Sequence, residues 1–463
     1  MAITGSRSRT RSPTHPSPTI EHPLDASRVT VPAALRARGA TLHRQIYSCL
    51  LRASLPLAFG RLLWRSRHTP AYRRRWAQRL GFGPPAPSGC VWLHAVSVGE
   101  VNAALPLIDA LQRAHPELPL LVTTTTPTGS DYLVSRLGQR VAHCYLPYDL
   151  PGAVRRFFRR QRPRLGIIME TELWPNLYAA AAAAKVPLLL TNARLSPRSA
   201  RGYGRWPRLS QQTLERLAAV GVQTAADGAR LIALGLPPAR LTVTGNLKFD
   251  AVAPDPAAGL ALRRRLGEGR PVWLAASTHV GEEQAALSAH RLLRAEHPDA
   301  VLILAPRHPQ RFADIARLCR EQGWATRLRS ADDGQPCAVY LADSLGELPS
   351  LMAAADIVFV GGSLGTSPTA TGGHNLIEPA QIGKPSLFGP YMNNFAELRE
   401  LVLAAGAGQQ VANDADLAAQ LAALLTDPAR CAVMDQAAQA LVAQHRGATA
   451  RTLALIEPYL EPG

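Results

Sequence analysis

Lysine is scarce in this chain of 463 residues, although the formal net charge is +17. Only Lys185, Lys248 and Lys384 are lysines, so almost all of the 51 basic residues are arginines. Acidic residues are nearly missing from the first 88 positions, where 15 arginines accompany only Glu21 and Asp25. The remaining 375 residues hold 36 basic and 32 acidic groups. Because the body is nearly neutral, the sequence argues against a nucleic-acid-binding body and indicates a polyanion or membrane surface as partner of the N-terminus.

Cysteine is also sparse, and its spacing is uninformative for metal binding. The six cysteines show no C-x-x-C pair, which predicts reduced, mostly buried thiols in a cytoplasmic protein and no zinc site. Asp414-Ala415-Asp416 matches a metal-binding D-x-D pattern, but it opens a helix rich in Ala and Leu. We expect Asp414 to be the N-cap of that helix, so no metal and no other cofactor is predicted.

Long uninterrupted apolar runs are missing too. The most apolar segment, residues 46–64, contains Arg52, Pro56 and Arg61, whereas a spanning helix needs about 20 consecutive apolar residues. A basic and aromatic stretch follows it, which is typical of a helix at an anionic membrane surface; a core helix with a solvated basic face is the alternative. We therefore predict a disordered Arg/Ser/Pro-rich extension over residues 1–40 and a membrane-associated anchor over residues 41–88, with no cleavable signal peptide.

From residue 89 onward, short apolar runs alternate with helical patterns. The expected strands of a first domain, residues 89–250, start at Val91, Leu120, Leu165 and Val186. Those of a second domain, residues 251–463, start at Val272, Val301, Val339 and Ile357 after a Pro-rich link. Such alternation predicts two doubly wound α/β domains with parallel sheets, whose ligands lie beyond the carboxyl ends of the strands. Face to face, the two domains would form a cleft.

The stretch over residues 361–379, GGSLGTSPTATGGHNLIEP, is the most unusual in the chain. It follows an expected buried strand over residues 357–360, carries two glycine pairs, and ends in His374, Asn375 and Glu378 before Pro379. A strand, a glycine loop and a helix start together offer backbone N–H groups and a helix dipole to an anion. The alternative is an ordinary flexible loop.

Carboxylates and cations at other strand ends complete the candidate site. Glu100 begins a helix, where the dipole would keep the carboxylate ionised, as a general base requires; a helix-favourable surface acid is the alternative. Glu170 follows an apolar strand, Lys248 lies near the domain link, and Arg307 has the geometry to bind a phosphate or to cap a helix. Together these residues point to transfer from a nucleotide-activated donor to an amphiphilic acceptor.

Seven motifs in this order resemble those of the 3-deoxy-D-manno-octulosonic acid (Kdo) transferase family. They are SVGE (97–100), METELWPN (169–176), NARLS (192–196), GNLKFD (245–250), STHVGEE (277–283), PRHPQRF (306–312) and GGHNLIEPA (372–380). The resemblance runs from about residue 46 to the C-terminus, and the first 40 residues depart from it as an extension. It implies a GT-B fold and an inverting transfer of Kdo from CMP-Kdo to the glucosamine 6-hydroxyl of a lipid A precursor, at the cytoplasmic face of the inner membrane.

The resemblance also implies roles for individual residues. Glu100 would be the base, and Glu170 and Lys248 would stabilise the transition state. CMP would be held by Pro306, Arg307, Leu345, Gly346, Glu347, Leu348, Asn375, Leu376, Ile377 and Glu378. Further contacts to donor or acceptor are expected from Ser97, Gly99, Arg194, Ser277, Thr278, His279, Gly362, Ser363 and His374.

Two other functions fit the residues. One is a different GT-B enzyme that uses a UDP-sugar, which nucleotide trials would separate from a Kdo transferase. The other is a membrane-associated anion-binding protein without catalysis, for which Glu100→Ala would change nothing and loss of residues 1–88 would abolish binding.

Overall fold

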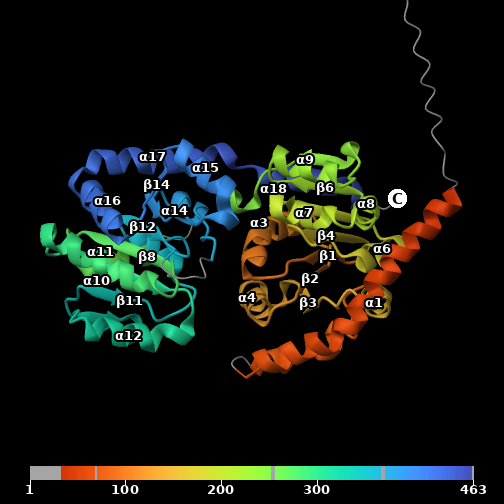
Figure 1. The fold of residues 1–463 in the computed structure, drawn as a ribbon, viewed down its shortest axis with the longest axis horizontal. Coiled ribbons are helices and arrows are strands. Elements are labelled where there is room, and N and C mark those ends of the chain that lie inside the picture. Colours follow the sequence, from red (N-terminus) through yellow and green to blue (C-terminus); the bar gives the residue numbers. More distant parts are fainter. Residues whose placement is uncertain (1–32, 68–69, 252–255, 366–370, 461–463) are drawn as a thin grey trace, which may run out of the picture.

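The computed structural model describes residues 33–67, 70–251, 256–365 and 371–460, with side chains from residue 42 onward except that of residue 256. Most of the predicted extension, the Pro-rich link and part of the glycine stretch lie outside these ranges. Within them, the chain forms two α/β lobes with a long N-terminal helix against the first lobe (Figure 1).

The first domain is built on a parallel sheet of seven strands among the described residues, in the order β3-β2-β1-β4-β5-β6-β7. Its central strands β1, β2, β4, β5 and β6 are buried, as parallel sheets covered by helices require. Trp92 of β1 packs against Phe157 and Phe158 of α5 at the centre of one helix layer. The elements are β1 (Val91–His94), α3 (Val98–Ala114), β2 (Leu120–Thr124), α4 (Pro127–Leu137), β3 (Ala142–Tyr145), α5 (Pro151–Gln161), β4 (Leu165–Met169), α6 (Pro175–Ala183), β5 (Leu188–Ala193), α7 (Pro197–Gly204), α8 (Pro207–Leu214), β6 (Ala219–Val222), α9 (Ala225–Ala233) and β7 (Leu241–Val243).

The second domain repeats this plan in the parts of the chain that the structure describes, with seven parallel strands in the order β10-β11-β9-β8-β12-β13-β14. Its elements are α10 (Pro256–Leu266), β8 (Val272–Thr278), α11 (Glu282–Glu296), β9 (Val301–Pro306), α12 (Phe312–Glu321), β10 (Thr326–Leu328), β11 (Val339–Leu341), α13 (Leu348–Ala354), β12 (Ile357–Val360), α14 (Ile377–Gln381), β13 (Ser386–Phe388), α15 (Ala396–Ala404), β14 (Gly408–Gln410), α16 (Asp414–Thr426) and α17 (Pro428–His445). The prediction of two doubly wound parallel domains is confirmed.

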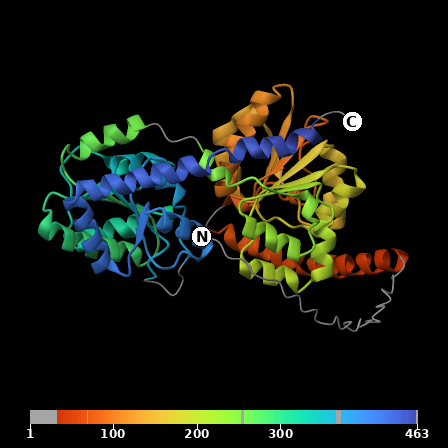
Figure 2. The same ribbon diagram turned by 90° about the horizontal axis from the view of Figure 1, so that it is seen from above.

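The last helix, α18 (Ala448–Ile456), returns to the first domain (Figure 2). Arg451 of α18 donates from Nε to the carbonyl of Thr244 at 2.9 Å. The carboxylate of Asp250 accepts the backbone N–H groups of Gly447 and Thr449 at 2.8 and 2.5 Å. The chain therefore crosses between the domains twice, once near residue 251 and once before α18.

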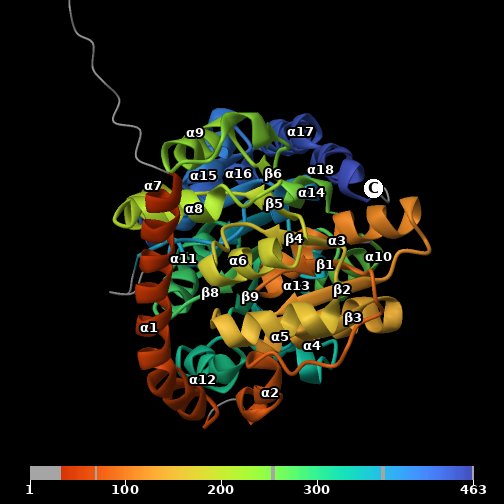
Figure 3. The ribbon, with the colours of Figure 1, turned by 90° about the vertical axis from the view of Figure 1, so that its right-hand side faces the viewer.

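The N-terminal helix α1 (Ala33–Arg65) lies along the first domain beside α6 and α8, and the short helix α2 (Trp76–Arg79) follows it (Figure 3). It begins inside the segment predicted to be disordered, because Ala33, Ala34 and Leu35 are strong helix formers. The prediction at Asp414 also differs from the structure. Asn413 is the N-cap of α16, since its side chain accepts the N–H of Asp416 at 3.0 Å.

Candidate active site

The strand order of each sheet changes direction near the centre of the sheet, and several of the predicted site residues follow the strands at these two points. In the first sheet the reversal lies between β1 and β4, and in the second between β8 and β12. Ligands of doubly wound sheets bind at such switch points, beyond the carboxyl ends of the strands. Glu100 lies just after β1 and Glu170 directly after β4, while Ser277 and Thr278 end β8 and the glycine stretch follows β12.

Glu100 lies in the first turn of α3, beside Ser97 and the exposed Gly99. Its carboxylate accepts the backbone N–H of Val96 at 2.7 Å. Burial and, to a smaller extent, the nearby Glu170 carboxylate raise the pKa of Glu100 to about 8, against the opposing effect of that hydrogen bond. The expectation that the helix dipole keeps this group ionised at neutral pH is therefore wrong, because burial outweighs the dipole. A carboxylate with a raised pKa is a stronger base once it is deprotonated.

Glu170 is almost buried and forms two salt bridges. Its Oε1 atom lies 3.2 Å from Nζ of Lys248, and its Oε2 atom lies 3.1 Å from Nε of Arg194. Burial alone would raise the pKa of Glu170, but Lys248 and Arg194 reverse that effect and lower it below its usual value. The structure thus brings together Glu100, Glu170, Lys248 and Arg194, with one carboxyl protonated and the other ionised near neutral pH.

Left-handed backbone conformations mark the ends of these strands. Glu170, Asn192 and Ser277 have φ angles of 57°, 50° and 56°, respectively. Such conformations are uncommon for residues other than glycine and concentrate at functional sites. Asn192 is fully buried; its Oδ1 accepts the N–H of Leu247 at 3.0 Å, which orients the turn that carries Lys248.

The two domains touch through the same residues. Arg194 donates from Nη1 to the carbonyl of Asn394 in the second domain at 3.2 Å. Gln381 of α14 donates to the carbonyl of Lys248 at 2.7 Å, and Arg230 forms a 2.6 Å salt bridge with Glu397. Arg194 therefore contacts Glu170 on one side and the opposite domain on the other.

The first glycine pair of the second domain binds an internal carboxylate. Glu282 of α11 accepts the N–H groups of Gly362, Ser363 and Leu364 at 2.6, 2.9 and 2.9 Å, and that of His279 at 2.9 Å. Ser363 is fully buried, and its hydroxyl donates to the carbonyl of Val360. These N–H groups are consequently satisfied within the protein, and the anion that the glycine loop attracts here is the side chain of Glu282.

Three histidines gather beside this loop. Nε2 of His279 lies 2.9 Å from Nε2 of His374, with the two rings stacked, and the His308 ring meets His279 edge-on at 5.2 Å between centroids. Burial lowers the pKa of all three rings, and that of His374 falls to about 3. The cluster is neutral at physiological pH and includes Arg307 among its charged neighbours.

The expected CMP-binding residues divide into two groups. Asn375 donates from Nδ2 to Glu378 at 3.2 Å, and its Oδ1 accepts the N–H of Ile377 at 3.1 Å. Burial raises the pKa of Glu378, while Lys248 and Arg307 oppose this effect, so the Asn375–Glu378 segment lies near both cations. Glu347, by contrast, is held by Arg329 at 2.7 Å, and Leu345 beside Gly346 is exposed.

The remaining expected positions take different environments. Pro306 ends β9, and Arg307 after it is exposed. The side chains of Leu376 and Ile377 are buried, Leu348 packs against the core, and Thr278 is buried with its hydroxyl donating to Glu283 at 3.0 Å. The side chains of these apolar residues and of Thr278 have no free hydrogen-bonding group for a ligand. Any hydrogen bond from these positions to CMP would therefore come from the backbone.

Three residues in the site were not singled out as candidates. Glu282 and His308 lie within the motifs STHVGEE and PRHPQRF, and Asn192 opens NARLS. Their roles depend on contacts between strands that are distant in sequence, so only the motif positions themselves could have pointed to them. Within the described ranges, no group of three or more His, Cys, Asp or Glu side chains has a geometry that could hold a metal ion.

Comparisons with known proteins agree on one family. A family model described as "3-Deoxy-D-manno-octulosonic-acid transferase (kdotransferase)" matches residues 74–251. A 3-deoxy-D-manno-octulosonic acid transferase of Haemophilus influenzae is 38% identical over 91% of this chain and 99% of its own length. One of Bordetella pertussis is 41% identical over 90% of this chain and 100% of its own length.

Solved structures resemble the fold at low sequence identity. A UDP-GlcNAc 2-epimerase from Neisseria meningitidis superposes with a TM-score of 0.56 at 17% identity, covering 80% of this chain and 99% of that one. A UDP-N-acetylglucosamine 2-epimerase homologue from Listeria monocytogenes gives a TM-score of 0.55 at 18% identity, covering 81% and 97%. These likenesses confirm the predicted GT-B arrangement of two doubly wound domains. With its motifs, topology and close relatives in agreement, this chain belongs to the 3-deoxy-D-manno-octulosonic acid (Kdo) transferase family.

Proposed function

We propose that this Kdo transferase moves Kdo from CMP-Kdo to the glucosamine 6-hydroxyl of a lipid A precursor, with inversion at the anomeric carbon. The observation that carries the proposal is the pairing of two carboxyls with different environments, Glu100 with a pKa of about 8 and Glu170 held ionised by Lys248 and Arg194. Two titratable groups whose environments separate their pKa values are a common mark of acid–base assignments in active sites.

In the proposed reaction, deprotonated Glu100 removes the proton of the acceptor hydroxyl. The hydroxyl oxygen bonds to the anomeric carbon of Kdo from the face opposite CMP, and the bond from that carbon to the phosphate oxygen breaks. The bonding electrons leave with CMP, whose phosphate then carries the extra negative charge. Lys248 and Arg307 would stabilise this charge; the proposal is supported by their common effect on Glu378, whose pKa both of them lower.

Donor binding is proposed for the second domain. Glu378 is a candidate partner for the ribose hydroxyls, with Asn375 orienting its carboxyl at 3.2 Å. Since Lys and Arg side chains neutralise a departing phosphate in this proposal, we expect no metal requirement. The two-domain division near residue 251 would then separate acceptor binding from donor binding.

The membrane partner of the proposal is the cytoplasmic leaflet of the inner membrane. Among the described residues, Leu42–Arg65 is the one helix that is long and apolar enough to cross a membrane, and 11% of its most apolar stretch is buried. Ser48, Leu62 and Ser66 of α1 and its continuation are nevertheless buried. Contacts at both ends favour a helix that lies along the membrane surface with its domain, since spanning the bilayer would break them.

The test is an assay with CMP-Kdo and a tetra-acylated lipid A precursor, in detergent, with the product weighed by mass spectrometry. A gain of one or more Kdo masses that Glu100→Ala abolishes, with CMP still bound, supports the proposal. No gain with any acceptor, or full activity of Glu100→Ala, contradicts it. Product formation from a UDP-sugar instead would favour the other GT-B function.

A further inference from the structure

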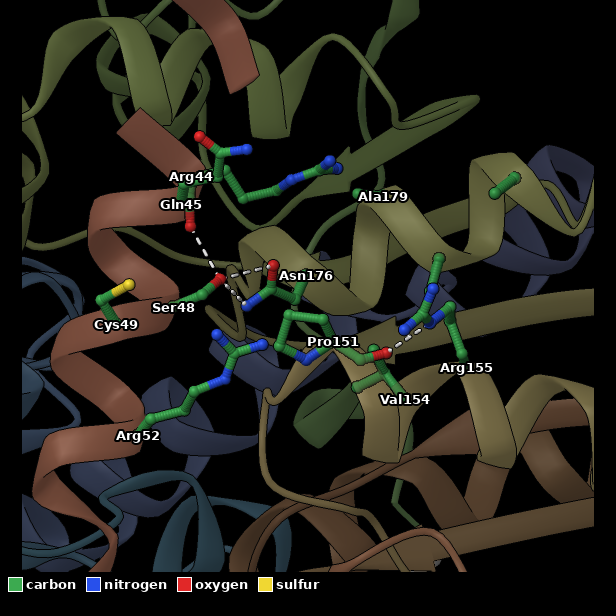
Figure 4. Close-up of a pocket in the computed structure, with 12 residues that line it drawn as sticks. Arg44, Gln45, Ser48, Cys49, Arg52, Pro151, Val154, Arg155, Asn176 and Ala179 are labelled. Atoms are coloured by element: carbon green, nitrogen blue, oxygen red, sulfur yellow. Dashed lines mark hydrogen bonds between the residues drawn. The ribbon is translucent and has the colours of Figure 1, made fainter. Parts of the chain in front are cut away.

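A cavity of about 500 Å³ lies between α1 and the helices α5 and α6 of the first domain. Figure 4 shows Arg44 and Arg52 projecting from α1 along one wall and Arg155 from α5 along the other. None of the residues that line it belongs to the candidate active site. The cavity is therefore a separate feature of the face that carries α1.

The lining is basic and includes no acidic side chain. Among the described residues, no salt bridge involves Arg44, Arg52 or Arg155. The nearby Asp149 is buried, and its two oxygens accept the N–H groups of Asn176 and Leu177 at 3.0 and 2.6 Å. Three guanidinium groups around one hollow leave a concentration of positive charge and N–H donors that matches a phosphate.

The floor of the cavity is rigidly built. Ser48 of α1 and Asn176 of α6 are each 4% exposed, and their side chains are joined by hydrogen bonds of 3.0 and 3.1 Å (Figure 4). Asn176 also donates to the carbonyl of Asp149 at 2.7 Å. This network fixes α1 to the domain, so the helix backbone that carries Arg44 and Arg52 is held beside α6 without a ligand.

An apolar stripe runs along the exposed side of α1. Its side chains recur at intervals of four and seven residues, which places them on one side of a helix: Leu42, Ile46, Leu50, Leu57 and Trp64 are 54%, 42%, 58%, 78% and 61% exposed, respectively. A free phosphate ion cannot contact such an apolar surface favourably, whereas a lipid carries acyl chains in addition to its phosphate. Charge and hydrophobicity together thus favour an amphiphilic anion.

We propose that this cavity binds the phosphate headgroup of an anionic phospholipid, while the apolar stripe of α1 enters the acyl region of the same leaflet. The inference rests on the membrane location given under the proposed function. It goes beyond that location because it names the site of contact. A fixed headgroup site would hold the first domain in one orientation on the membrane.

The first experiment measures binding of the full-length protein to phosphatidylcholine vesicles with and without phosphatidylglycerol. The variant Arg44→Gln/Arg52→Gln/Arg155→Gln removes the three cavity charges. The control Arg264→Gln/Arg317→Gln/Arg320→Gln removes three charges from the second domain. We expect about a fivefold loss of affinity for each cavity arginine, and so about a hundredfold for the cavity variant. The control should stay within about twofold of the wild type, because screening limits the reach of distant charges.

Equal losses in both variants, or no loss in the cavity variant, would overturn the proposal. An equal loss of affinity of the cavity variant for vesicles with and without phosphatidylglycerol would also overturn it, because the three arginines would then not recognise the anionic headgroup. Transfer activity measured in detergent distinguishes failure of the headgroup site from failure of the proposed function. Vesicle binding without activity contradicts that function alone, and full activity with unselective vesicle binding contradicts only the headgroup site.

A second measurement does not depend on the folding of a triple variant. Cys49 lines the cavity and is exposed, whereas Cys431 lies in the second domain and is half-buried. In the wild-type protein, phosphatidylglycerol vesicles should slow the reaction of Cys49 with a water-soluble maleimide at least about tenfold while leaving Cys431 unchanged. Equal protection of Cys49 by pure phosphatidylcholine vesicles, or none by either, would contradict the inference.

Discussion

The pKa of Glu100 leads to a pH profile that can be worked out in advance. If Glu100 must lose its proton to act as a base, kcat/KM follows the ionised fraction of this carboxyl in the free enzyme. With a pKa of about 8, that fraction is about 1% at about pH 6, about 10% at about pH 7 and about one half at about pH 8. We therefore expect kcat/KM to rise about tenfold over the first interval and about fivefold over the second.

Two variants should move this profile in opposite directions. The carboxylate of Glu172 raises the pKa of Glu100, and Lys248 lowers it. Glu172→Gln should therefore shift the rise to lower pH. The variant glutamine can still accept the hydrogen bond that Nε1 of Trp174 donates to Glu172 at 2.6 Å. Lys248→Met should shift the rise to higher pH and also lower the activity at its plateau.

The assay is initial-rate transfer at limiting CMP-Kdo and lipid acceptor across this pH range, with thermal unfolding followed in the same buffers. The unfolding control separates titration of Glu100 from loss of the fold. A flat profile between about pH 6 and pH 8, or a shift of both variants in the same direction, would refute the assignment of Glu100 as the base.

Three further predictions concern the surrounding residues. Glu282→Ala leaves four backbone N–H groups without their acceptor. We therefore expect the free energy of unfolding to fall by at least about 3 kcal/mol and the Tm in calorimetry to fall by about 6–12 °C, with a smaller loss for Glu282→Gln. An unchanged Tm would show that the glycine loop does not need this carboxylate. Arg194→Lys keeps the positive charge but loses the guanidinium group that contacts both Glu170 and Asn394. We expect kcat to fall about ten- to hundredfold with an unchanged Tm. A wild-type kcat would show that Arg194 has no role in transfer. A chelator should leave the transfer rate unchanged, and loss of activity restored by a divalent cation would contradict the proposed neutralisation by Lys248 and Arg307.

The sequence was sufficient to predict the central strands of each sheet, because these strands are apolar on both faces and bounded by turn residues. Leu165–Met169, Val339–Leu341 and Ile357–Val360 lie at the predicted positions. Two strands beyond β12 in the second sheet, Ser386–Phe388 and Gly408–Gln410, were not predicted. Their three residues carry no periodic pattern, and they become strands only because β12 and its neighbours offer backbone partners.

The motifs of the sequence by itself identified the family and named Glu100, Glu170 and Lys248 as candidates, because short motifs keep their residue types and order whatever surrounds them. Only the tertiary structure decided the charge states and contacts of these residues. The helix dipole at Glu100 can be read from local sequence, but the burial and the Glu170 carboxylate that outweigh it come from other strands. In the same way, Glu282 reaches the loop 80 residues later, and α1 meets Asn176 from 128 residues away. Electrostatics and hydrogen bonding act through space, so these outcomes depend on which segments the fold brings together.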